Sequence, residues 1–142
     1  MPDVVTAVMP LLWGSALLLQ PVEGVLTQGV TTAHRAIDLS CVAGAPVHAA
    51  HDGVGVSHWD RDLGLVVTLR DSQGLITTYG HLQSAAPAGS FLRGAVIGTC
   101  GNSGRLTTGA HLHFGSNQLD RLQQLASPLP AATDVAVQEV AP

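Results

Sequence analysis

Residues 107–115 read TTGAHLHFG, in which two histidines stand one residue apart between glycine and phenylalanine. Residues two apart on a strand face the same side at a spacing of about 6.5 Å, so His111 and His113 are expected to project into one space. Only 11% of the chain is charged, so two polar side chains on one strand face need a reason. Such a pair holds a metal, moves protons or fills a core, and an isolated H-x-H is most often structural. The rest of the sequence has to decide among these uses.

The chain before this stretch has the pattern of short strands joined by tight turns. Residues 63–70 and 75–82, LGLVVTLR and LITTYGHL, flank the turn sequence DSQG and predict a hairpin. The 16 glycines and few aromatic residues also favour many turns. We therefore predict an all-β fold, an antiparallel sheet with a barrel-like or sandwich-like arrangement. One short helix is predicted over residues 117–126, where leucines recur at helical spacing.

A chain of 142 residues is the size of one domain. We expect residues 28–126 to form that domain, residues 1–27 to be a packed N-terminal segment or loop, and residues 127–142, rich in proline and alanine, to be a tail. The apolar run near the N-terminus lacks a basic flank and is interrupted by Pro10 and Gly14. It therefore predicts a packed segment rather than a signal peptide or a membrane span.

The charge pattern argues against nucleic acid as a partner. The formal net charge is −4, the chain has no lysine, and its six arginines are scattered, so no basic stripe exists to neutralise phosphates. A monomer is the default expectation.

Cys41 and Cys100 form no C-x-x-C motif. Whether they form one disulfide or stay two buried thiols is open, because sequence does not give their Cα separation.

A second motif, HRAID, places His34 four residues before Asp38. On a straight strand this spacing separates them by about 13 Å, too far for ligands that each lie about 2 Å from one metal. If they share a metal, the chain between them has to turn, and the local sequence favours an irregular loop that enters a strand. Taken alone, H-x-x-x-D is better explained by a surface pair.

Taken together and in order, the motifs HRAID, GAPVHAAHDGVGV, GLITTYGHL and GAVIGTCGNSGRLTTGAHLHFG resemble the zinc-dependent M23 family of peptidoglycan endopeptidases, the lysostaphin and LytM-like group. The resemblance spans residues 28–115 and includes all three metal and catalytic motifs of that family. It implies a single all-β domain with the duplicated hybrid motif of the family and an open groove whose floor carries zinc.

Carried over residue by residue, the resemblance makes His34, Asp38 and His113 the zinc ligands, and His81 and His111 the catalytic histidines. Two imidazoles and one carboxylate leave a fourth position on zinc open, as catalytic zinc sites do. Zinc would activate water for attack on a peptide bond near neutral pH. His81 or His111 would take the proton of that water and return it to the leaving amine. Which histidine performs which step stays open.

Weaker candidates for the substrate groove are Tyr79, Asn102 and Thr108. Tyr79 stands two residues before His81, so a regular strand would place both side chains on one face. Burial in the hairpin is the alternative for this tyrosine. The glycine-rich loop that contains Asn102, Ser103 and Thr108 resembles the loop that borders the groove in the family, and turn formation is the alternative for these three.

The activity that the resemblance implies is hydrolysis of peptide cross-links or stem peptides of bacterial peptidoglycan. It would take place in the cell wall, the periplasm or the extracellular space, and the enzyme would be bacterial or phage-encoded. One alternative is a non-catalytic binding or activator domain on the same scaffold, and another is a phosphocarrier domain of related β-architecture.

Ala36 stands where the family commonly has glycine, and Gly115 stands where the family often has an acidic residue. Neither departure removes a ligand or a catalytic group.

Overall fold

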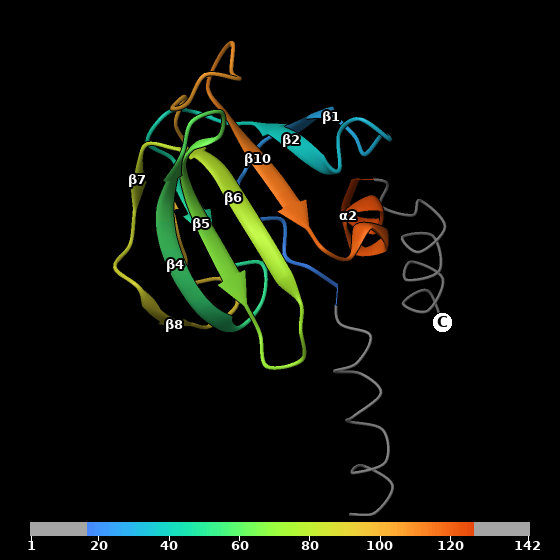
Figure 1. Ribbon diagram of the computed structural model, residues 1–142, viewed down its shortest axis with the longest axis vertical. Helices are drawn as coiled ribbons and strands as arrows, with labels where there is room; N and C mark the ends of the chain where they lie inside the picture. The colour runs from blue at the N-terminus through green and yellow to red at the C-terminus, as the bar shows by residue number, and fades with distance from the viewer. Residues whose placement is uncertain (1–16, 127–142) are drawn as a thin grey trace, which may run out of the picture.

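The computed structural model describes residues 17–126, whose strands form two antiparallel sheets (Figure 1). The larger sheet has seven strands in the order β1-β2-β10-β6-β5-β4-β8, and the smaller has three in the order β3-β9-β7. The elements are β1 (Val25–Gln28), β2 (Ala36–Ser40), β3 (Pro46–His48), β4 (Gly53–Asp60), β5 (Gly64–Arg70), β6 (Ile76–Leu82), β7 (Ser84–Ala85), β8 (Gly89–Phe91), β9 (Val96–Thr99), β10 (His111–Ser116) and α2 (Leu119–Ala126). The predicted all-β antiparallel fold is confirmed, and the sheets of the described residues do not close into a barrel.

The β5–β6 hairpin lies where the turn sequence predicted it. The amide of Asp71 donates to the carbonyl of Leu75 at 3.0 Å. The Asp71 carboxylate accepts the amides of Gln73 and Leu75 at 2.8 and 2.9 Å. Gly74 has a φ of +93°, a conformation that glycine adopts without steric cost. The turn residues therefore form this loop through local hydrogen bonds of the aspartate and the freedom of the glycine.

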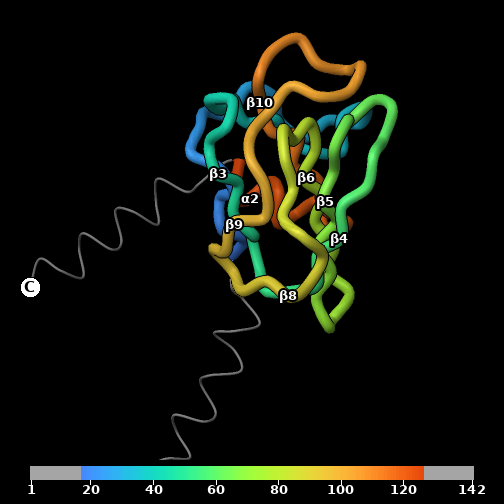
Figure 2. Tube along the Cα trace, turned by 90° about the vertical axis from the view of Figure 1, so that its left-hand side faces the viewer, coloured from blue at the N-terminus to red at the C-terminus, as the bar shows by residue number. Residues whose placement is uncertain are grey.

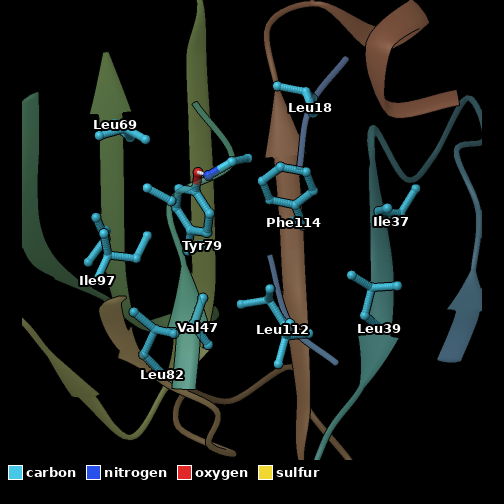
Figure 3. Packing of buried hydrophobic residues seen from close by; sticks show 14 of the residues in the cluster. Leu18, Ile37, Leu39, Val47, Leu69, Tyr79, Leu82, Ile97, Leu112 and Phe114 are labelled. Carbon is cyan, nitrogen blue, oxygen red and sulfur yellow. Dashed lines mark hydrogen bonds between the residues drawn. The ribbon is translucent and has the colours of Figure 1, made fainter. Parts of the chain in front are cut away.

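The hydrophobic core lies between the two sheets. Figure 2 shows β3 and β9 side by side, and both contribute to the core, through Val47 and Ile97. From the larger sheet, Leu112 and Phe114 of β10 and Tyr79 of β6 point into the same core (Figure 3). All five side chains are fully buried. Because side chains alternate along a strand, burial of Leu112 and Phe114 sends the intervening histidine of β10 to the opposite face.

Both ends of the described chain pack on the sheets. Leu18 and Val22 are buried in the core, and the amide of His48 donates to the carbonyl of Pro21 at 2.6 Å. The predicted helix forms as α2, beside the end of β10, and buries Leu122 (Figure 1). The expected tail and the first 16 residues of the N-terminal segment lie outside the described residues, so the proposed domain boundaries stay predictions. Within residues 17–126, no helix is long and apolar enough to cross a bilayer.

A disulfide joins Cys41 to Cys100, with a Cα separation of 6.3 Å across 59 residues of sequence. Cys41 directly follows β2, and Cys100 directly follows β9. The bond therefore connects the two sheets at the end where the glycine-rich loop begins. The sequence left this pairing open, and the structure supports the disulfide alternative.

Candidate metal centre and active site

Asp38 and His113 lie opposite each other on neighbouring strands of the larger sheet. The β2–β10 register pairs His113 with Asp38, and the β10–β6 register pairs His113 with Gly80. Directly opposite residues of antiparallel strands present their side chains on the same face. As a result His113 Nδ1 lies 3.4 Å from Asp38 Oδ1.

His34 reaches the same carboxylate from a turn that precedes β2. Thr31 and His34 exchange backbone hydrogen bonds of 2.8 and 3.2 Å, and the Thr31 hydroxyl accepts the amide of His34 at 3.0 Å. β2 begins only at Ala36, so the chain at His34 is not part of a straight strand, and His34 Nε2 lies 3.4 Å from Asp38 Oδ1. His34 Nδ1 lies 3.2 Å from the carbonyl of Gly29. Because a carbonyl only accepts, Nδ1 carries a proton, and in the neutral ring the Nε2 lone pair faces Asp38.

The geometry around Asp38 Oδ1 fits a metal ion. This oxygen is buried and has no hydrogen-bond partner, whereas buried polar atoms almost always have one. Its 3.4 Å distances to His34 Nε2 and His113 Nδ1 are close to the separation of about 3.3 Å between two ligands of tetrahedral zinc with bonds of about 2.0 Å. The ligand atoms of all three residues lie within 4.8 Å of one another. A nitrogen-rich set with one carboxylate suits zinc.

The charge state of Asp38 also suits a ligand. Burial alone would raise the pKa of this carboxyl, but contact with His113 and the charges of His34 and His111 outweigh that effect. The pKa of Asp38 is therefore lowered, and the carboxylate stays ionised.

His81 enters the site through an unusual backbone conformation. It is the only non-glycine residue among residues 17–126 with a positive φ, at +62°. The ring lies beside His111 and His113, with ring centroids 4.6 and 6.0 Å apart. Its Nδ1 lies 2.7 Å from the carbonyl of Ser103, so Nδ1 carries the proton and Nε2 is left as a base. Burial lowers the pKa of His81, which favours the neutral ring.

His34, Asp38 and His113 form the candidate metal-binding group. His111 projects toward this group from the first position of β10. Its Nε2 lies 3.9 Å from Asp38 Oδ1, farther than the corresponding nitrogens of His34 and His113. Its Nδ1 lies 2.8 Å from the carbonyl of Gly109, which fixes the proton on Nδ1 as for His81. The structure therefore brings together all five residues that the sequence singled out for metal binding and catalysis.

The prediction that Tyr79 contacts substrate is wrong. Tyr79 has no exposed surface and packs in the core beside Phe114, with ring centroids 5.2 Å apart. Its hydroxyl accepts the amide of Ala50 at 3.0 Å and lies 2.8 Å from the Thr77 hydroxyl. Period-two alternation placed Tyr79 and His81 on one face, but the left-handed backbone at His81 turns its ring to the opposite side.

Asn102 and Thr108 are both exposed in the loop between β9 and β10. The Asn102 side chain accepts a hydrogen bond from the Thr107 hydroxyl within the same loop. Asn102 also lines an open pocket of about 590 Å³, together with Trp59 and Gln83. The residues lining this pocket include none of the metal-binding group, so a role of Asn102 or Thr108 in substrate binding stays a proposal.

Sequence reasoning missed the groups that orient the histidine rings. Three of these groups are main-chain carbonyls, those of Gly29, Ser103 and Gly109, and a carbonyl leaves no residue-type signal. The departure at Ala36 has no conformational consequence, because Ala36 is not among the residues with a positive φ.

Comparison with known proteins identifies the family. The model of peptidase family M23 matches residues 32–125, more than half of the chain, and this range contains all five site residues. The chain belongs to peptidase family M23. The resemblance seen in the sequence motifs is therefore confirmed.

Known M23 proteins are similar in sequence and in structure. The peptidoglycan DD-endopeptidase ShyC of Vibrio cholerae is 40% identical over 89 residues, which cover 61% of this chain and 20% of ShyC. An M23 peptidase structure from Pseudomonas aeruginosa is 31% identical with a TM-score of 0.65, covering 75% of this chain and 47% of that one. A zinc-containing peptidase structure from Vibrio cholerae is 27% identical with a TM-score of 0.62, covering 71% and 36%. This chain thus spans about a fifth of the curated relative and less than half of each structure.

Proposed function

We propose that this protein is a zinc-dependent endopeptidase that hydrolyses peptide cross-links or stem peptides of bacterial peptidoglycan. The observation that carries the proposal is the buried, unpartnered Asp38 Oδ1 with an imidazole nitrogen at 3.4 Å on each side. Membership of family M23 and similarity to a peptidoglycan DD-endopeptidase and to a zinc-containing peptidase support it.

Each of the five site residues has a role in this proposal. His34, Asp38 and His113 would hold zinc. When bound, zinc supplies positive charge that polarises a peptide carbonyl and activates water for attack near neutral pH. His81 and His111 each have the proton on Nδ1, held by a main-chain carbonyl, and present Nε2 to the site. One Nε2 atom accepts a proton from the attacking water and the same atom or its neighbour delivers a proton to the leaving amine.

The proposed site of action is the cell wall, the periplasm or the extracellular space, where peptidoglycan is found. Asn102 and Thr108, exposed in the loop before β10, are proposed to border the substrate. The identity of the bond is left to experiment, because D-alanyl cross-links, glycyl bridges and stem peptides all present a peptide carbonyl and an amine leaving group to the same five residues.

Digestion of purified sacculi tests the proposal directly. The zinc-loaded protein is incubated with sacculi of several cross-link chemistries, and released fragments are identified by mass spectrometry. We expect new peptide amino termini on intact glycan strands, and no release by Asp38→Asn, which keeps the shape of the side chain but not its charge. Bound zinc without release from any sacculus would contradict the proposal and favour a binding or activator domain.

A further inference from the structure

We propose that Ser103 is a positioning residue for His81. Its hydroxyl fixes the loop segment whose carbonyl orients the His81 ring. This inference rests on the proposed function, since it assigns a supporting residue to one of the proposed catalytic histidines. Ser103 neither binds the metal nor carries a proton, and it acts only through His81.

Ser103 contacts both His81 and the residues around it. The Ser103 carbonyl accepts the Nδ1 proton of His81 at 2.7 Å. The Ser103 hydroxyl donates to the carbonyl of Leu82 at 2.7 Å, and it accepts the amide of Leu65 at 3.0 Å. One residue therefore connects the His81 ring, the residue that follows it in β6, and the beginning of β5.

His81 needs such support because its backbone is strained. A left-handed φ is unfavourable for a residue with a side chain, and it persists only where the surrounding structure holds it. Its amide donates to the carbonyl of Leu63 at 2.6 Å instead of to a partner strand. Leu63 lies in the turn between β4 and β5, so the backbone of His81 is held by the same hairpin that binds Ser103.

Close backbone packing fixes Ser103 against this hairpin. Gly64 and Gly104 have φ values of +70° and +92°. A Cβ atom at Gly64 would overlap Ser103, and one at Gly104 would overlap the main chain of residues 62–64. The amides of Arg105 and Leu106 extend this contact, donating to the carbonyls of residues 61 and 62 at 3.0 and 3.1 Å. This packing holds the loop segment against the hairpin, and the two hydrogen bonds of the Ser103 hydroxyl set the orientation of the Ser103 peptide within it. Loss of the hydroxyl should therefore shift the carbonyl that orients His81.

The test compares Ser103→Ala, Ser103→Thr and a matched control, Ser116→Ala. The Ser116 hydroxyl also accepts a backbone amide, that of Gln118 at 3.0 Å, but at the far end of β10. For each zinc-loaded protein, zinc stoichiometry, thermal unfolding, and kcat and KM on a cleaved peptidoglycan peptide are measured. The exchange rate of the His81 Nδ1 proton is measured by NMR, with the resonance assigned by its absence in His81→Gln.

We expect Ser103→Ala to keep its zinc and its fold but to exchange the His81 Nδ1 proton faster than the parent. Its kcat should fall roughly tenfold at nearly constant KM, the effect of losing about one hydrogen bond's free energy. Ser103→Thr, which keeps a hydroxyl, and Ser116→Ala should resemble the parent.

An unchanged exchange rate and kcat in Ser103→Ala would overturn the inference. So would joint loss of fold and zinc in both Ser103 variants, or a parent without a protected His81 Nδ1 proton. The proton exchange is independent of catalysis, so inactivity of the parent on every sacculus would refute the proposed function without deciding the role of Ser103.

Discussion

Two groups of polar side chains lie toward opposite ends of β6, and they differ in whether every polar atom has a partner. At one end, His51 Nε2 lies 2.8 Å from the Thr77 hydroxyl, and His51 Nδ1 lies 2.8 Å from the carbonyl of Asp52. The Thr77 hydroxyl in turn lies 2.8 Å from that of Tyr79, which accepts the amide of Ala50. At the other end, histidines surround an Asp38 oxygen that has no partner.

The difference shows how a buried histidine that supports the fold can be told from one that serves a site. The His51 group, defined here as His51, Thr77 and Tyr79, is closed, because each nitrogen and hydroxyl already has a neighbour within hydrogen-bonding distance. The metal-binding group is open, because the proton on His34 Nδ1 is used by Gly29 while Nε2 faces a carboxylate oxygen that accepts nothing. A closed network stabilises the fold, and an open one indicates a ligand.

The largest effect is expected for His113→Ala. This change removes one of the two imidazoles next to Asp38 Oδ1, so zinc should be lost and peptidoglycan hydrolysis with it. Metal analysis of the purified variant beside the parent measures the first effect, and release of fragments from sacculi measures the second. Retention of zinc at the level of the parent would break the comparison, because the open group would then not be the metal site.

A smaller effect is expected for His111→Ala, whose imidazole lies at 3.9 Å from Asp38 and is not counted among the three ligands. The variant should keep its zinc and lose turnover by a factor of about 10² to 10⁴, the usual contribution of a general acid or base. The measurement is kcat at equal zinc loading. Equal metal retention in the His111 and His113 variants would contradict the division of roles between them.

Much of this arrangement could be predicted from sequence because it follows from period-two alternation. That rule put His111 and His113 on one strand face, and the register against Asp38 agrees. The same rule failed at Tyr79, because one residue with a φ of +62° reverses the face of His81. Histidine is enriched in this conformation compared with most residues, but the enrichment is too weak to predict it.

Other parts of the site depend on contacts between residues far apart in the chain. A shared metal required the chain between His34 and Asp38 to depart from a straight strand, but the hydrogen bonds that hold His34 to Thr31 could not be foreseen. The Cys41–Cys100 pairing depends on a Cα separation that only the packing of β2 and β9 sets. Carbonyl partners of histidine rings are likewise invisible in sequence, because every residue has a carbonyl.

Tyr79→Phe tests whether the closed His51 group stabilises the fold without taking part in the site. Burial raises the pKa of Tyr79 to about 12, so its hydroxyl stays protonated and acts only through hydrogen bonds. Removing it leaves the amide of Ala50 without an acceptor, and the free energy of unfolding should fall by about 1–3 kcal/mol. Zinc content and KM should not change. Chemical denaturation measures the free energy of unfolding, and kinetics at the same pH measure KM. A raised KM with unchanged stability would indicate that Tyr79 contacts substrate after all.

The smallest expected effect is a pH dependence of stability from His51. Burial lowers the pKa of His51 below its usual value of about 6.5, and the hydrogen bond to the Asp52 carbonyl and the charge of Asp71 offset this only in part, while Arg121 adds to it. Below pH 6.5 the unfolded chain therefore binds a proton that the folded chain takes up only at lower pH. The contribution of His51 to the free energy of unfolding is therefore complete above about pH 6.5 and is lost as the pH falls through the pKa that His51 has in the folded protein.

His51→Gln isolates this contribution, because glutamine does not titrate and the two proteins are otherwise identical. Unfolding of the metal-free parent and variant is compared from above pH 7 to about pH 5. The advantage of the parent over His51→Gln should be largest above pH 6.5 and should shrink on acidification. A constant difference across this range would show that protonation does not disrupt the closed group. The contrast between the two ends of β6 would then rest on hydrogen-bond geometry alone.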